Sequence, residues 1–418
     1  MKTWFSGLLA AIIGFTAAVL FGNSGQFDII VGNACSILLN IGTFILIPLT
    51  FVTLFAATAS LRQEKGLIGP VYLVGSAWSI FTSLALSLLA GLAFRYFPCD
   101  FPMTASGSYT TSASLADVFS SNLSDAAAYY NPLSNTPLQN LLISQDFLLP
   151  AAFTAFVFGF AMKPDHDAIK PAYAVTNSFS EVMFRLSRLM SNLCWVFILF
   201  FSAYWFKEVL ASGLLDIPNF LITIGIAVAV AVGAVIPLLY CIFTGFKGNP
   251  YRLVFRTISQ AGLGLFSGNM LLSLTGNYHL CRRNNGVQKR VVSTTLPFGT
   301  FFTRGGTAMI STICLCALCT RAHLDVLNFG TIAMIAGVCT LTSMASALNL
   351  GYETIFVTVI GARMMGIDLG GLEVLMIAVL PIVNGAGVLI DMVLCSLGTN
   401  VAGRAIEAVV PVSFKETL

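Results

Sequence analysis

Long apolar runs separated by short charged segments follow one another along the first 250 residues. The uncharged stretches are Trp4–Phe21, Cys35–Leu61, Leu67–Phe94, Phe147–Met162, Leu189–Phe206 and Ile217–Phe246. Most approach the ~20 residues that a helix needs to cross ~30 Å of hydrocarbon, and the short fourth run is expected to begin earlier, near Leu138. The runs are continuous rather than alternating, which excludes a β-barrel. The pattern predicts six helical spans. A signal peptide is the less favoured interpretation of the first run.

The remaining apolar segments are interrupted by Gly, Ser, Thr, Asn and Arg. Four stretches show this pattern: Phe266–Tyr278, Phe298–Thr307, Thr340–Gly351 and Val383–Arg404. Irregular backbone at membrane depth is tolerated only where protein or a water-filled cavity surrounds it. Interrupted segments are also the best sequence indication of a transporter's substrate site. We therefore expect broken, inward-dipping segments around a wet pocket.

The composition supports a membrane protein. Of 418 residues, 57% are hydrophobic and 9% are charged, with a net charge of +3. Soluble domains carry about 25% charged residues, so an ordinary soluble enzyme is excluded. A disordered chain and a nucleic-acid binder are excluded as well, because each needs a polar or basic surface. The expected surroundings are a lipid bilayer, with no nucleic-acid partner.

The distribution of charge predicts the orientation. Residues 99–146 contain no Lys or Arg, whereas basic residues occur at Arg62, Lys163, Lys247 and Arg282. Positive loops stay in the cytoplasm. The charges thus predict a cytoplasmic N-terminus and an acidic loop outside.

Catalytic motifs are missing from the sequence. It contains no Ser-His-Asp order, Walker loop or HExxH motif. The CxxC formed by Cys316 and Cys319 lies in an apolar run without a second pair, which favours core packing over a metal site. We therefore expect neither an enzyme nor a bound metal.

Five collinear stretches resemble one known family. They are LIPLTFVTLFAATASL (46–61), NPLSNTPLQNLLISQDFLLPAAFTAFVFGFAM (131–162), SFSEVMFRLSRLM (178–190), TTLPFGTFFTRGGTAM (294–309) and NVAGRAI (400–406). The chain resembles the dicarboxylate/amino acid:cation symporters, the sodium:dicarboxylate or glutamate-transporter-like group. The resemblance extends over nearly the whole chain.

The resemblance implies an all-α elevator-type fold with eight transmembrane helices and two re-entrant helical hairpins, at about 251–290 and 326–363. It implies a homotrimer in which residues 1–250 are mainly scaffold and trimerisation spans, including an external loop at 98–146. The third span is shared with the transport domain. Residues 251–418 would form that moving domain.

The resemblance also implies a site on span seven, where the family carries Asn-Met-Asp-Gly-Thr. The aligned residues here are Thr303, Arg304, Gly305, Gly306 and Thr307. Gly305 replaces the family's cation-ligand aspartate, and Arg304 lies beside it. A guanidinium 4 Å from sodium repels it by about 4 kcal/mol at ε near 20. One hypothesis is that arginine charges stand in for bound cations. The other is that coupling is to protons or to a substrate gradient.

The other candidate site residues lie on span eight, on the hairpin tips and on span three. On span eight, Asn400 keeps a family position, Arg404 replaces an aspartate, and Asp391 resembles an aspartate that selects amino-group substrates. The further substrate candidates are Asn269, Ser273, Ser343, Ala345, Ser346, Asn349 and Asn384. The cation candidates are Gly306, Asn400, Thr82 and Ser83.

Structural alternatives remain for several of these residues. Arg304 could pair with a carboxylate such as Asp391, because an ionisable side chain inside a membrane segment needs a partner or a function. Arg404 lies near the cytoplasmic end and could extend to the interface. Asn384 and Asn400 could form interhelical hydrogen bonds.

These residues predict a secondary symporter for a small carboxylate-bearing solute, a dicarboxylate or an amino acid. Sodium or a proton would be the coupling ion, and no other cofactor is expected. An uncoupled anion pore and a transport-dead binding protein are the alternatives.

Overall fold

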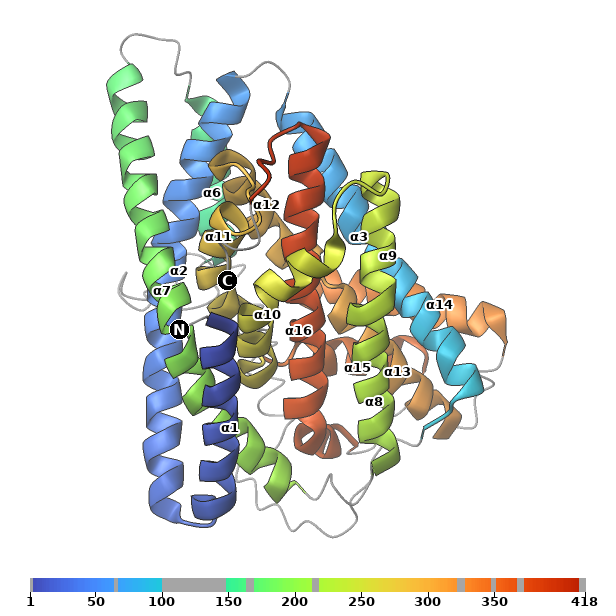
Figure 1. The fold of residues 1–418 in the computed structure, drawn as a ribbon. Helices are drawn as coiled ribbons and strands as arrows, with labels where there is room; N and C mark the ends of the chain where they lie inside the picture. The colour runs from blue at the N-terminus through green and yellow to red at the C-terminus, as the bar shows by residue number, and fades with distance from the viewer. Residues whose placement is uncertain are drawn as a thin grey trace, which may run out of the picture.

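The computed structural model describes residues 3–63, 67–99, 148–162, 169–212, 218–321, 328–346, 351–366 and 372–412. The described part is built of helices, and an isolated bridge joins Val287 to Val409. Figure 1 shows the helices from blue α1 to red α16. All ten cysteines are free thiols.

The first half contains long helices that match the predicted spans. They are α1 (Thr3–Phe21), α2 (Gly25–Gln63), α3 (Ile68–Tyr96), α6 (Leu148–Ala161), α7 (Lys170–Ala211), α8 (Pro218–Val230), the π-helical turn η3 (Ala231–Val235) and α9 (Ile236–Thr244). Two helices extend beyond their apolar runs. Helix α2 begins at Gly25 because Asp28 in its first turn favours the helix N-terminus and pairs with Lys207 at 3.1 Å.

A proline explains the π-helical turn within the sixth span. Pro237 has no N–H, so the carbonyl of Gly233 loses its usual helical donor. The hydroxyl of Tyr251 donates to that carbonyl at 3.0 Å instead. Helices α8 and α9 thus continue as one membrane-length element with a local bulge.

The second half contains the shorter helices that the interrupted pattern predicts. They are α10 (Pro250–Ser267), α11 (Met270–Arg283), α12 (Lys289–Phe302), α13 (Gly305–Arg321), α14 (Phe329–Ala345), α15 (Glu353–Met364) and α16 (Leu372–Ala405). Breaks after Ser267 and Phe302 confirm two of the expected interruptions, and α14 ends inside the third. The region before Leu148, including the expected start near Leu138, lies outside the described residues.

The expected interruption at Val383–Arg404 is wrong, because α16 runs through it as one helix. Its glycines provide close packing instead of a break. A Cβ on Gly385 would collide with the carbonyl of Leu265, and one on Gly398 would lie 2.6 Å from the Trp78 ring. The polar side chains of α16 bond to neighbouring helices, as described below.

The helices form two packed groups. Helix α7 packs against α1 and α2, and α6 packs against α2; α2 and α7 run side by side along the left edge of Figure 1. Helix α16 packs against α10, α12, α13, α15 and α3, and α8–α9 also lies on this second group.

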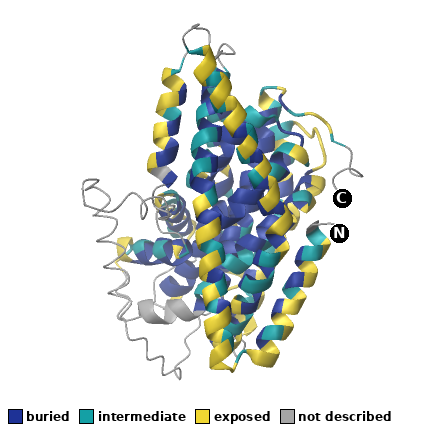
Figure 2. Cartoon of the chain, turned by 90° about the vertical axis from the view of Figure 1, so that its left-hand side faces the viewer, coloured by how far each residue is buried: buried dark blue, intermediate teal, exposed yellow. Residues whose placement is uncertain are grey.

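The helices differ in how much of their surface is buried, which separates core helices from outer ones. Of the apolar window in Lys289–Thr320, 89% is buried, against 22% of that in Trp4–Phe21. Within the described residues, seven helices are long and apolar enough to cross a membrane, and Pro150–Ala161 and Phe329–Ala345 are shorter apolar helices. Figure 2, coloured by burial, shows exposed residues along the outer helices and buried residues in the centre.

Candidate functional site

The break between α12 and α13 is stabilised by the side chain of Arg304. In a continuous helix the Arg304 N–H would donate to the carbonyl of Thr300. Here it donates to Phe302 at 3.1 Å, while Nε of the same arginine donates to Thr300 at 2.8 Å. The arginine therefore satisfies, with its side chain, the carbonyl that its backbone leaves free.

Asp391 of α16 caps the N-terminus of α13. Its carboxylate accepts from the N–H of Gly306 at 2.6 Å and from the hydroxyl of Thr307 at 2.6 Å. The N–H of Thr307 adds longer bonds of 3.3 and 3.4 Å. A helix N-terminus carries unpaired N–H groups and a partial positive charge, so it stabilises the fully buried carboxylate.

Helix α15, the second half of hairpin 2 (α14 and α15), supplies the acidic partner of Arg304. Nη1 of Arg304 lies 3.3 Å from Oε1 of Glu353, the first residue of α15. Both side chains are buried, with exposed fractions of 1% and 0%. Oε2 of Glu353 accepts from the N–H of Gly351 at 3.0 Å. Arg304 therefore forms its ion pair with Glu353 rather than with Asp391.

Asn384 of α16 joins the tips of both hairpins. Its Nδ2 donates to the carbonyls of Gly268 at 2.8 Å and Gly351 at 2.9 Å. Its Oδ1 accepts from the N–H and the hydroxyl of Thr354, at 3.3 and 3.2 Å. One carboxamide thus links α16, the turn between α10 and α11, and the start of α15.

The first hairpin tip holds Asn269 and Ser273 in local bonds. Gly268 has φ +60°, a left-handed conformation that glycine adopts readily. Asn269 then caps α11 through its side-chain oxygen, which accepts from Leu271 at 2.9 Å. The hydroxyl of Ser273 lies 3.4 Å from the carbonyl of Asn269. These bonds shape the tip that Asn384 holds.

The second hairpin tip is only partly described. The hydroxyls of Ser343 and Ser346 donate to backbone carbonyls within α14, at 2.8 and 2.6 Å. Ala345 is exposed. Asn349 lies outside the described residues.

Helix α3 lies against the break in span seven. The hydroxyls of Ser79 and Thr303 lie 2.7 Å apart, and Thr82 donates to the carbonyl of Trp78 at 2.7 Å. Within the described residues, the fully buried hydroxyl of Ser83 has no hydrogen-bond partner. A Cβ on Gly305 would lie 3.2 Å from the Cα of Ser83. Ser83 is thus an unsatisfied oxygen beside the break.

Asn400 and Arg404 lie far from Asp391 along α16. Thirteen residues separate Asp391 from Arg404, which is about 20 Å at about 1.5 Å per residue. The side-chain oxygen of Asn400 accepts from the hydroxyl of Tyr240 at 2.7 Å and from Nε of Arg404 at 2.8 Å. The structure therefore brings together Arg304, Gly306, Thr307, Asn384 and Asp391, and places these two residues elsewhere.

A cavity opens beside the hairpin tips, between the two helix groups. We name this cavity of about 740 Å³ the vestibule. Its walls come from α2, α7, the two tips and α16, and they include Ser267, Gly268, Gly351 and Asn384. Its volume suits a small solute.

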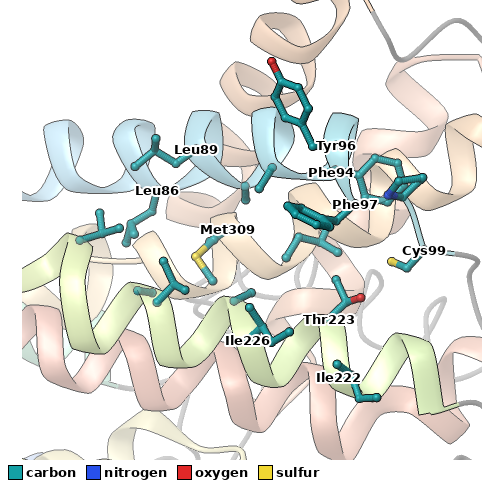
Figure 3. Close-up of a pocket in the computed structure, with 18 of the residues that line it drawn as sticks. Leu86, Leu89, Phe94, Tyr96, Phe97, Cys99, Ile222, Thr223, Ile226 and Met309 are labelled. Atoms are coloured by element: carbon teal, nitrogen blue, oxygen red, sulfur yellow. The ribbon is translucent and has the colours of Figure 1, made fainter.

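A second cavity, of about 660 Å³, lies between α3, α8 and α13 (Figure 3). Its lining is largely apolar and includes Leu86, Ile226 and Met309. Such a lining does not suit a carboxylate, because no partner compensates for its lost hydration. The vestibule is therefore the better candidate for solute entry.

Sequence reasoning missed Glu353, Thr354 and the tip carbonyls. Glu353 could have been found, because it is the one acidic residue in the sequence 326–363 and intramembrane acids are functional candidates by default. The carbonyls of Gly268 and Gly351 carry no sequence signal. Within the described residues, no group of three or more His, Cys, Asp or Glu side chains could hold a metal ion.

The described helices define a multi-pass helical membrane protein. The sodium:dicarboxylate symporter family model matches residues 4–410, so the chain belongs to that family.

Curated relatives match a shorter region. Over 197 residues the chain is 28% identical to excitatory amino acid transporter 1 of Homo sapiens, with 46% of this chain and 35% of the relative covered. The protein of the same name from Rattus norvegicus gives the same values. The matched region spans about a third of these relatives' length.

Proposed function

We propose that this protein is a secondary active symporter for a small carboxylate-bearing solute, a dicarboxylate or an amino acid. The observation that carries the proposal is the meeting of both hairpin tips at Asn384, beside the vestibule. A gate formed by two hairpin tips over a buried polar site allows access from one side at a time.

The two packed groups support an elevator movement. We propose that residues 1–250 form mainly scaffold spans, that residues 251–418 form the transport domain, and that α3 moves with the latter. Helices α8–α9 contact α16, α10 and α3. These contacts support the proposal that α8–α9 moves together with the transport domain. The assembly would be a homotrimer in the cytoplasmic membrane, with both termini inside.

The coupling ion would be a cation, sodium or a proton. Arg304 carries one positive formal charge, and Glu353 and Asp391 carry two negative ones, so this buried group favours a cation over an anion. The ion pair with Glu353 also compensates the positive charge of Arg304. Ser83 and Thr82 remain candidate cation ligands, supported by the unsatisfied Ser83 hydroxyl.

Counterflow in liposomes tests the proposal. Purified protein is reconstituted with internal unlabelled aspartate or succinate, and uptake of the labelled solute is measured in sodium and in choline. Saturable counterflow is the expected result. A non-saturating conductance would favour an anion pore, and binding without counterflow a transport-dead protein. Uptake that persists in choline would exclude obligatory sodium coupling.

A further inference from the structure

Among the described residues that line the vestibule, one carries a charge, the acid Glu208 of α7. The nearby Lys207 does not line the cavity. Its Nζ lies 3.2 Å from Glu208 and 3.1 Å from Asp28, so one cation is shared by two carboxylates. The local balance is therefore negative.

Aromatic side chains form much of the remaining wall. They are Phe201, Tyr204, Trp205, Phe266 and Tyr352. The Trp205 indole is fixed in place, because its N–H donates to the carbonyl of Pro381 at 2.8 Å. Aromatic faces attract ammonium groups through their negative quadrupole. A carboxylate surrounded by aromatic side chains therefore favours the binding of an amine.

The buried group behind the hairpin tips, Arg304 with Glu353 and Asp391, also has a negative net formal charge. Arg304 is already paired with Glu353, and Asp391 accepts hydrogen bonds from the N-terminus of α13. Among the described lining residues, the polar side chains besides Glu208 are neutral, and they include Ser36, Asn40, Ser267 and Asn384. A dianion would lose water here without gaining a cationic partner.

We infer that the vestibule selects an amine-bearing solute without net negative charge, in preference to a dicarboxylate. This inference rests on the proposed function only in taking the vestibule as the entry path of the transported solute. Within that function it favours the amino-acid class over the dicarboxylate class. Glu208 would be a specificity-determining residue that attracts the amine.

Three four-carbon probes with different end groups test this inference. They are succinate with two carboxylates, 4-aminobutyrate with one carboxylate and one amine, and putrescine with two amines. Binding to the full-length protein in nanodiscs is measured by titration calorimetry. We expect both amines to bind at least about tenfold more tightly than succinate. Equal or tighter binding of succinate would overturn the inference.

Charge removal at the vestibule identifies the group responsible. Glu208→Gln should weaken putrescine binding about fivefold, the effect of losing about 1 kcal/mol of charge attraction in water, and leave succinate no weaker. The matched control is Glu181→Gln on the same helix, whose carboxylate is also ion-paired, here with Arg282 at 2.9 Å and Lys289 at 3.4 Å. That variant should bind putrescine as the unaltered protein does. Equal losses in both variants would contradict a local role for Glu208.

A second variant tests the aromatic wall should Glu208→Gln fold poorly. Tyr352→Leu keeps bulk but removes the ring, and it should weaken putrescine more than succinate. Counterflow separates the two proposals. If succinate binds more tightly than the amines and undergoes counterflow, the amine inference is wrong and the transporter proposal stands. If the amines bind but no probe undergoes counterflow, the transporter proposal is wrong and the amine site stands.

Discussion

Arg304 shows how one side chain both breaks a helix and compensates the break. Its Nε takes over the carbonyl of Thr300, and its Nη1 reaches Glu353 of hairpin 2. A buried ion pair contributes little compared with apolar residues of similar volume, but losing one partner leaves an uncompensated charge. The pair therefore links the span-seven break to the hairpin.

Removing the charge of Arg304 and that of Glu353, separately and together, tests this link. Arg304→Met or Glu353→Met alone should destabilise the protein by about 3–5 kcal/mol, because each leaves the other charge buried and unpaired. The double variant should recover most of that loss. Unfolding by SDS titration measures the free energies. A double variant no more stable than the single ones would contradict the pairing.

The Asp391 cap makes a second prediction at this scale. Asp391→Asn should lower stability by about 1–2 kcal/mol, as loss of a charged cap does. Thr307→Val removes the hydroxyl that donates to the same carboxylate. The two effects should be non-additive, with a coupling of about 0.5–3 kcal/mol in a double-mutant cycle. Strict additivity would mean that the two side chains do not interact.

Between elements, the contact of α13 with α16 depends on glycine. A Cβ on Gly306 would collide with the carbonyl oxygen of Gly387 and lie 2.5 Å from Ile390 Cβ. Since a backbone carbonyl cannot move aside as a flexible side chain can, the two helices would have to separate. This close approach is also what brings Asp391 to the start of α13.

Gly306→Ala should therefore destabilise the protein by about 1–3 kcal/mol, in spite of alanine's better helix propensity. The control is Gly337→Ala in α14, where an added Cβ would meet nothing within 4 Å. That variant should be neutral or up to about 1 kcal/mol more stable. Melting temperatures in detergent compare the two. Equal shifts in both variants would refute the packing argument.

At the scale of the whole molecule, Asn384 connects the elements that a gate requires. It holds the carbonyls of both tips from the central helix α16, next to the vestibule. Trp205 makes a further connection, from α7 of the first helix group to Pro381 of α16. Movement of one group past the other has to break this second bond.

Asn384→Leu should loosen both hairpin tips at once. Amide hydrogen exchange should rise in residues 268–272 and in residues 351–356, because two distant segments lose the same partner. Hydrogen-exchange mass spectrometry measures both. The matched control is Asn400→Leu on the same helix, whose side chain contacts Tyr240 and Arg404 instead. Faster exchange at only one tip would show that Asn384 does not couple them.

Much of the fold could be predicted from the sequence, because membrane-length apolar runs and helix-breaking residues are local signals. The six first spans and the breaks at Ser267 and Phe302 follow from them. The interruption expected at Val383–Arg404 was wrong, since glycines mark close helix packing as well as breaks. The sequence also determined the family, through motifs in collinear order.

Only the tertiary structure decided how the site is connected. It paired Arg304 with Glu353, turned Asp391 into the cap of α13, and placed Arg404 beside Asn400. The first two contacts join residues 49 and 85 positions apart, and the third, between residues four positions apart on α16, depends on which face of that helix meets Tyr240 of α9. A local pattern cannot specify them, because the bond partner of a buried polar group is set by packing between helices.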